Sequence, residues 1–531
     1  MTTATLRSLR VGNRHYPVVL PSIRDPRLHL ASVIISIHVL GQIALGFRVS
    51  VPQILSAIVT CAAIEVVWTL RRTGQLVWPA SAMLTGSGVA LIFRVLGTER
   101  GEHWSWRGWY LFALVAAVSL LTKYVIRFRG SHVFNPSNVG LVLAFLVLGS
   151  SRVEPLDFWW APLDGWMVAA YLIILVGGLL ITARLRLLAM AATFWIALAG
   201  GLGLVAASGH CMIAAWSLSP VCGLHFWWVV VTSPEILIFL FFMITDPKTI
   251  PAGSLARIAF AACLAMVCTL LIAPQTTEFG AKVGLLAGLV VMTPLRLFFE
   301  RIFQAQRADS DPLSTIVTRL TTSSRSAISP LRVVVRGAVV GSLAVFLVVG
   351  TVAAGAPARE PQLAGPSDDV SETRVEIDPA TLPPVNVGAD VLALNSDIAG
   401  GDFNDLATQL AENLKIEGEA ILSGDSSLLV EVDSGSRLVE MQRRIDEALS
   451  TGVRRVQNYT FESLDLSVVF TNGSQGGPGL GFAARGVVEE ITHDALGVET
   501  GRTSAPFAST FVLRQGSGER WLLVDVLPES P

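Results

Sequence analysis

Two short polar steps, each an Asn or Asp followed by proline, interrupt long apolar runs of this sequence. The first, Phe134–Pro136, follows a basic, glycine-containing turn, and the second is Thr245–Pro247. Asn135 can cap a helix that begins at Pro136, because proline is tolerated at the first helical position and an Asn side chain accepts from a free N–H. Such a helix start suits an anionic group such as phosphate. We therefore expect the two steps to form part of a ligand site.

Two carboxylates, Glu65 and Glu235, lie within apolar runs. Charged groups are costly inside a membrane and usually serve function there, although a carboxylate near the interface or bonded to a neighbouring helix is the alternative. Asp246 either caps a turn at Pro247 or contacts a ligand. No Walker loop, nucleophile elbow or zinc spacing is present in the sequence.

These residues must be positioned by membrane-spanning helices. The chain has 531 residues, of which 52% are hydrophobic and 15% charged. Apolar runs of about 17–25 residues match the thickness of a bilayer. We expect eleven spans, at residues 29–47, 51–70, 78–97, 108–126, 135–150, 164–184, 187–207, 225–245, 255–273, 280–297 and 334–355.

Charge is divided unevenly along the chain. Residues 1–357 contain 27 Lys and Arg against 13 Asp and Glu, whereas residues 358–531 contain 12 against 28. Basic residues gather in alternate loops, which places the N-terminus in the cytoplasm and the acidic tail outside the cell membrane. The acidic tail argues against nucleic acid as a partner, and leaves the lipid bilayer and an extracytoplasmic protein.

Composition divides the chain into six parts. They are a cytoplasmic N-terminal segment (1–28), a membrane core (29–297), a basic cytoplasmic linker (298–333), an eleventh helix (334–355), a second linker (356–389) and an acidic extracytoplasmic α+β domain (390–531). In the last part the pattern predicts helices at 402–415 and 437–450, and strands within 420–432 and at 464–470, 481–491, 508–515 and 521–526. A binding or docking module is the expected role of this domain.

The ten spans of the core divide into five before and five after the loop at 150–163. Because each half has an odd number of spans, the second half enters the membrane from the opposite side to the first. We therefore expect a 5+5 inverted repeat, with a site where the halves meet. The third and eighth spans would then correspond. Both contain small or helix-breaking residues, which mark either a site or close helix packing.

Cys211 and Cys222 share one loop. If that loop is outside the cytoplasm, as the charge pattern predicts, the two cysteines can form a disulfide.

The membrane core resembles the RnfD/NqrB-like family, whose members are membrane components of the Rnf electron-transport complex and of the sodium-translocating NADH:quinone reductase. The similar segments are Ala80–Leu91, Lys123–Val139 with its Phe-Asn-Pro, and Thr245–Pro247 after Phe-Phe-Met. The match covers about residues 29–297, and residues 15–300 look closest to the UnbU branch, which is associated with enediyne antibiotic biosynthesis.

The resemblance implies a flavin-linked protein that passes electrons across the membrane together with other redox proteins. The covalent FMN motif of those relatives is not found, so the resemblance leaves non-covalent FMN or riboflavin. A transporter or self-resistance component, and a scaffold with an outer docking domain, are the alternatives. The residues expected to bind the cofactor are Ser81, Thr85, Gly86, Lys123, Arg129, Phe134, Asn135, Pro136, Asn138, Thr245, Asp246 and Pro247.

Overall fold

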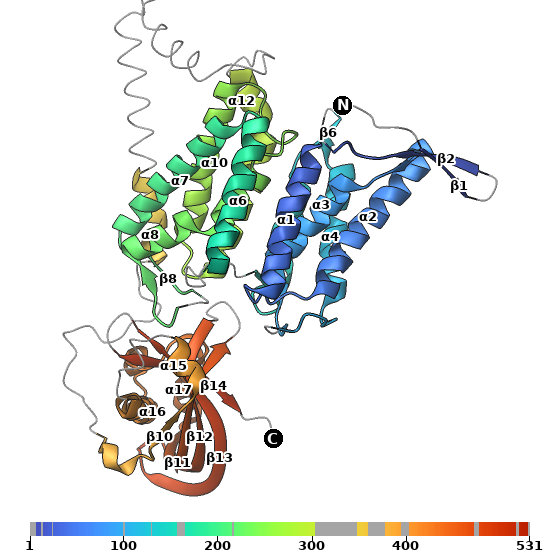
Figure 1. Ribbon diagram of the computed structural model, residues 1–531. Helices are drawn as coiled ribbons and strands as arrows, with labels where there is room; N and C mark the ends of the chain where they lie inside the picture. Colours follow the sequence, from blue (N-terminus) through green and yellow to red (C-terminus); the bar gives the residue numbers. More distant parts are fainter. Residues whose placement is uncertain are drawn as a thin grey trace, which may run out of the picture. The chain divides into compact units, whose positions relative to one another are not determined.

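The computed structural model describes residues 7–11, 14–23, 25–98, 101–128, 130–156, 165–214, 217–302, 348–358, 377–394, 403–471, 477–516 and 520–528. The chain forms two compact units. The first contains the apolar helices, and the second contains Cys211–Cys222, Thr276–Glu278 and Pro357–Pro531. Figure 1 colours both along the sequence.

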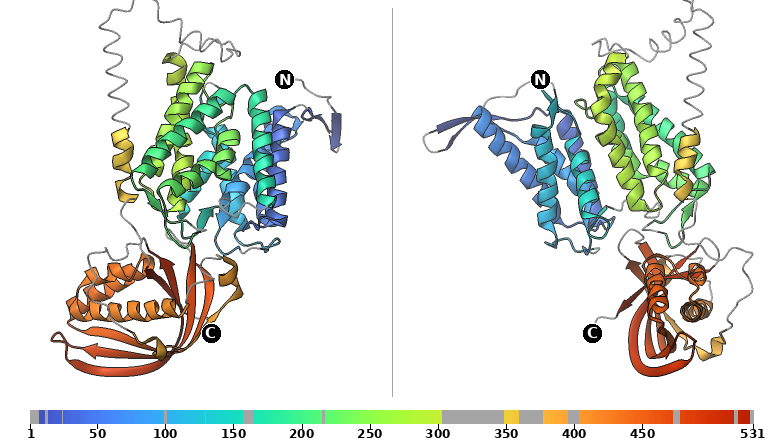
Figure 2. Two further views of the ribbon diagram at one scale, coloured as in Figure 1. Left: turned by 60° about the vertical axis from the view of Figure 1, so that its left-hand side comes forward. Right: turned by 180° about the vertical axis from the view of Figure 1, so that it is seen from behind.

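The first unit is helical. Its helices are α1 (Pro26–Ile43), α2 (Val51–Thr73), α3 (Ala80–Ile92), α4 (Trp109–Val125), α5 (Pro136–Leu148), α6 (Gly165–Arg184), α7 (Leu188–Ala207), α8 (Gly223–Thr232), α9 (Pro234–Ile238), α10 (Ser254–Ile272), α11 (Glu278–Met292) and α12 (Arg296–Ile302). Helix α2 packs against α3 and α4, α7 packs against α8 and α10, and α1 packs against α6. Figure 2 shows these helices from two further sides.

Seven segments of the described chain are long and apolar enough to cross a membrane, and α3, α4 and α5 are shorter apolar helices. All ten lie where the sequence predicts spans, so the membrane assignment is supported by length and composition. The expected span at 78–97 is wrong in extent. Helix α3 ends at Ile92, and the chain continues as β4 (Phe93–Val95), which pairs with β7 (Val153–Pro155). Of the expected eleventh span and the basic linker, only residues 298–302 and 348–355 lie among the described residues.

The eighth span is interrupted, as its Ser-Pro pair predicts. Helix α8 ends at Thr232, α9 begins at Pro234 with Ser233 as its cap, and a π-helix, η1 (Phe239–Met243), follows. The Tyr171 hydroxyl donates to the Thr232 carbonyl at 3.0 Å. A side chain from α6 thus satisfies a backbone group that the break releases, as a membrane interior requires.

The N-terminal segment contains strands that the sequence pattern does not predict. Strand β1 (Arg7–Val11) pairs with β2 (Arg14–Val19), which runs parallel to β3 (Leu76–Val77) at the end of α2. Both strands are short, and neither shows the apolar-polar alternation that predicts a strand from sequence.

The second unit contains one five-stranded sheet in the order β10 (Val385–Val387), β11 (Arg454–Thr471), β12 (Gly477–His493), β13 (Glu499–Gln515) and β14 (Trp521–Pro528). Strand β10 is parallel to β11, and the other neighbours are antiparallel. Helices α16 (Phe403–Ser423) and α17 (Gly435–Thr451) lie on one face of the curved sheet, with the short α15 (Ala389–Leu394) beside β11 (Figures 1 and 2). We call residues 377–528 the acidic domain.

The core of the acidic domain lies between α16 and the sheet. Leu410, Phe482 and Phe511 are fully buried in it. The long hairpin of β11 and β12 bends at a bulge between Phe461 and Ser463. Opposite the bulge, a Cβ at Gly486 would come within 2.0 Å of a backbone carbonyl, so only glycine fits there.

The strands predicted within 420–432 are wrong. Helix α16 continues to Ser423, and the 3₁₀-helix η5 (Ser426–Glu431) follows. Ala420 and Ile421 are buried against α17 in a small cluster with Met441. The apolar residues that read as strand therefore belong to a helix, and they pack against α17 and against Val456 of β11.

Candidate functional site

The two Asx-Pro steps lie next to each other in the first unit. The Nε2 atom of His132 lies 3.1 Å from Oδ2 of Asp246. The side-chain amide of Asn135 donates at 3.1 Å to the carbonyl of Met243, which is the last residue of the π-helix η1. We call this contact, formed by His132, Asn135, Asn138, Met243 and Asp246, the Asx-Pro junction.

Asn135 and Asn138 hold the start of α5 in place. Asn135 caps the helix, and its Oδ1 accepts from the Asn138 N–H at 3.4 Å and from the Ser137 hydroxyl at 2.9 Å. The Asn138 amide donates to the carbonyl of Leu286 in α11 at 2.9 Å. Both side chains are thus bonded to segments that follow the loop at 150–163, Asn135 to η1 and Asn138 to α11.

This geometry does not fit a phosphate at the start of α5. Pro136 has no N–H, and the N–H of Asn138 already donates to Asn135. The Asp246 carboxylate lies beside His132 in the same junction. A helix start attracts an anion through its free N–H groups. At the start of α5, Pro136 lacks this group and that of Asn138 is already bonded, so too few remain for a phosphate.

The second step is a turn with its own internal bonds. The Thr245 hydroxyl donates to the carbonyl of Phe241 at 2.5 Å, and Asp246 Oδ1 accepts from the Lys248 N–H at 3.0 Å. Asp246 therefore caps a turn and binds His132 at the same time. Pro247 is exposed, and Phe134 is half-buried.

Glu65 forms a polar cluster with residues of α3 and α4. The Lys123 ammonium lies 3.0 Å from Glu65 Oε2 and 3.3 Å from the Ser81 hydroxyl. The Tyr124 hydroxyl donates to Glu65 as well. We call Glu65, Ser81, Lys123 and Tyr124 the Glu65 cluster. The sequence places Lys123 at the Phe-Asn-Pro step, but in the structure it lies in the last turn of α4, where its ammonium pairs with Glu65 of α2. Arg129 lies outside the described residues.

The small residues of α3 serve close packing. A Cβ at Gly86 would come within 2.5 Å of the Ala57 carbonyl of α2, and a Cβ at Gly88 would lie 3.4 Å from the Ser137 side chain. The Thr85 hydroxyl donates to the Ser81 carbonyl at 3.1 Å within the same helix. Helix α3 thus approaches both α2 and the start of α5.

Glu235 forms a second charge pair. Its Oε1 lies 3.5 Å from the ammonium of Lys282 on α11, whose side chain is 6% exposed. Sequence reasoning missed Lys282, Tyr124 and the pair Arg94–Glu154, which joins β4 to β7 at 3.1 Å. Lys282 could have been found, because it is a lone lysine in the apolar run of α11.

No group of three or more His, Cys, Asp and Glu that could hold a metal ion occurs among the described residues. No family model matches the chain, and no curated protein is significantly similar to it.

Proposed function

We propose that the chain is an ion-coupled membrane transport protein in which two groups of helices, α1–α5 and α6–α12, meet at the Asx-Pro junction. One observation carries this proposal: each group contains a carboxylate paired with a lysine, Glu65–Lys123 and Glu235–Lys282. Ionisable residues inside a bundle of apolar helices mark ion and proton pathways. The interrupted eighth span and the short α3 and α5 support a 5+5 inverted repeat with the pathway at its interface.

Both pairs can respond to a proton or a small cation. A lysine ammonium is a point charge on a flexible stem, so it holds a carboxylate without fixing its geometry. A proton that binds Glu65 removes the ion pair, and leaves Lys123 with the Ser81 hydroxyl as a hydrogen-bond partner. A sodium ion would compete with the same lysine for the carboxylate oxygens. Either event changes the charge inside the membrane without moving a helix.

We place the N-terminus in the cytoplasm and the acidic domain outside. The basic loops support this orientation, and so does the disulfide between Cys211 and Cys222, since disulfides persist in oxidising compartments. A cysteine placed at the exposed Ser426 in η5 should react with a reagent that cannot cross membranes. If only a permeant reagent labels this cysteine, the orientation is wrong.

The test is ion uptake by the purified protein in sealed vesicles, with a proton gradient and a sodium gradient applied in turn. Glu65→Gln and Glu235→Gln should each slow uptake of the coupled ion about tenfold or more, equivalent to about 1.4 kcal/mol in the barrier. Glu447→Gln is the matched control, because this carboxylate is exposed on α17. If uptake by both membrane variants equals that of the wild type, the proposal is rejected.

A second candidate is flavin-linked electron transport, which the sequence resemblance implies. The observation that favours it is the contact among the three resembling segments: Gly88 of α3 approaches Ser137, and Asn135 reaches Met243 beside the second step. The junction does not fit a phosphate, so riboflavin is the flavin we expect, not FMN. A role in enediyne biosynthesis rests on the resemblance alone, as does assembly with other redox proteins.

The flavin candidate has its own test. The purified protein is denatured, and any released flavin is identified by its visible spectrum and by chromatography. Stoichiometric riboflavin supports electron transport, FMN would contradict our interpretation of the junction, and a preparation without flavin rejects the candidate. Transport by the flavin-free protein would leave the first proposal intact.

A further inference from the structure

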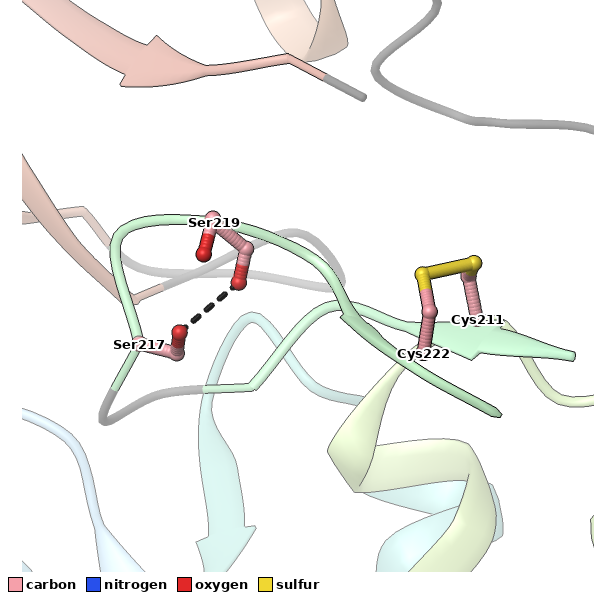
Figure 3. The surroundings of a disulfide bond; sticks show 4 residues. All are labelled: Cys211, Ser217, Ser219 and Cys222. Atoms are coloured by element: carbon pink, nitrogen blue, oxygen red, sulfur yellow. Dashed lines mark hydrogen bonds between the residues drawn. A yellow bond between two sulfur atoms is a disulfide. The ribbon is translucent and has the colours of Figure 1, made fainter. Parts of the chain in front are cut away.

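The loop that Cys211 and Cys222 close is part of the acidic domain's compact unit. Strands β8 (Cys211–Met212) and β9 (Val221–Cys222) pair with each other, and a disulfide joins Cys211 to Cys222. Figure 3 shows the sulfur bridge between the two strands and, at the tip, the Ser217 hydroxyl donating to the Ser219 carbonyl at 2.8 Å. We call residues 211–222 the disulfide hairpin.

The hairpin binds the acidic domain through a buried arginine. The guanidinium Nη2 of Arg514 donates to the carbonyls of Ala214 and Ser217, at 3.3 and 2.7 Å. Arg514 is 1% exposed, and burial lowers the pKa of its side chain to about 10, so that it stays charged at neutral pH. The two hairpin carbonyls therefore help to solvate a cation inside the domain.

Apolar contacts accompany this polar one. Ile213 is buried in a cluster with Val512, Leu522 and Val524 of β13 and β14. Leu218 packs against the larger core of the domain. The hairpin itself has only two paired residues in each strand. A peptide with so short a ladder does not keep its conformation alone, so its shape depends on the covalent bridge.

The bridge is open to attack from one end. Cys222 is exposed, whereas Cys211 is half-buried. A thiolate reaches the more accessible sulfur of a disulfide first, and the other sulfur leaves. Met212 and Val221, the next pair of the ladder, are both buried, so attack comes from the outer end of the hairpin, where Cys222 is the more exposed cysteine.

We propose that the Cys211–Cys222 disulfide is a site of thiol–disulfide exchange with a dithiol reductant, and that its opening releases the hairpin from Arg514. One thiolate of the dithiol attacks Cys222 Sγ, forms a mixed disulfide and expels Cys211 as a thiolate. The second thiol then attacks the mixed disulfide at the reductant's own sulfur and expels the Cys222 thiolate. The dithiol becomes a disulfide, and the hairpin gains two electrons and, on protonation of its thiolates, two protons. This inference does not depend on the ion-transport proposal.

The first experiment measures hydrogen exchange in the full-length protein before and after treatment with dithiothreitol, with alkylation and mass spectrometry to show that both thiols are free. Backbone amides of residues 510–515 and 522–524 should exchange about tenfold faster or more after reduction. The double variant C211S/C222S should exchange at the fast rate without reductant and should not respond to it. Cys263→Ser, which removes a thiol outside the hairpin, should behave as the wild type. Unchanged exchange in the fully reduced wild type would overturn the proposal.

A second experiment locates the attacked sulfur. A brief exposure to reduced glutathione, followed by acid quenching and peptide mapping, should find the glutathione adduct on Cys222. An adduct on Cys211 would overturn the assignment of Cys222 as the point of entry, even if the hairpin is released.

Discussion

The membrane helices and the acidic domain both bury a carboxylate beside a cation, but they hold it differently. In the Glu65 cluster, Lys123 and Glu65 are 14% and 15% exposed and meet through a single ammonium at 3.0 Å. In the acidic domain, Arg437 and Glu417 are each 5% exposed, and Nε and Nη2 of the arginine bind the two carboxylate oxygens at 2.6 Å each. The planar guanidinium fixes the geometry of a carboxylate, and an ammonium does not.

This difference suggests different uses for the same charges. The arginine pair joins α16 to α17 and fixes their packing. The lysine pair lies between helices that pack through small residues, and its ammonium does not fix the geometry of the carboxylate. A buried pair is therefore no sign of function by itself, and the type of cation is the more informative feature.

The largest effect should come from breaking the arginine pair. Arg437→Met leaves Glu417 buried without its cation, with Asp433 beside it, and should destabilise the acidic domain by about 3–5 kcal/mol. Urea titration followed by hydrogen exchange of β11 to β14 measures this in the full-length protein. Arg443→Met is the control, because Arg443 and Glu447 are 68% and 61% exposed and their pair contributes about 0–1 kcal/mol. Equal losses in both variants would contradict our comparison.

Breaking the lysine pair should cost less. In Lys123→Met, Glu65 keeps the Tyr124 hydroxyl as a hydrogen-bond donor, so the expected loss is that of one or two hydrogen bonds, about 1–3 kcal/mol. Thermal unfolding of the purified protein in detergent measures it. Adding Glu65→Gln to this variant should recover part of the stability. A loss as large as that of Arg437→Met would mean that Lys123 is structural.

The third effect concerns the pH dependence of the acidic domain. Asp433 is 2% exposed, and neither of its carboxylate oxygens accepts a hydrogen bond from a described donor. Burial, and then the charge of Glu417, raise the pKa of Asp433 well above its ordinary value. The folded domain therefore binds a proton that the unfolded chain releases above a pKa of about 3.9. Stability should fall as pH rises from there to the raised pKa, by about 1.4 kcal/mol per pH unit.

Asp433→Asn tests this pH dependence, because an amide has nearly the shape of the carboxyl and does not titrate. Its urea midpoint, measured between mildly acidic and neutral pH, should vary less than that of the wild type. Asp446→Asn, at an exposed position of α17, should keep the wild-type slope. If the wild type is more stable at neutral than at mildly acidic pH, Asp433 is not the controlling group.

Much of the helical part of the fold could be predicted from the sequence, since the length of an apolar run and the residues that cap it are local features. The cap at Asn135, the break at Ser233 and the disulfide at Cys211 are all confirmed. The end of α3 could not be predicted, because it depends on pairing of β4 with β7, which comes about 60 residues later.

The candidate site was predicted only in outline. Which cation binds each carboxylate depends on helix packing, and Lys123 lies 58 residues from Glu65 in the sequence. Likewise, the amide groups of Asn135 and Asn138 could donate to a ligand as readily as to a carbonyl. Only the structure shows that Met243 and Leu286 are their acceptors.

The first half of β13 affects how closely neighbouring copies of the protein can approach one another. Residues 499–506 are exposed and pair with β12, whereas the described part of β14, which ends at Pro528, covers β13 from Ser509 onward. An open strand edge invites the same edge of a second molecule. Here Pro506 lacks the N–H that a further strand would need, and Arg502 is held by Glu489 and Glu499 along the ribbon. The edge is thereby protected from aggregation, so neighbouring copies can crowd together without joining their sheets.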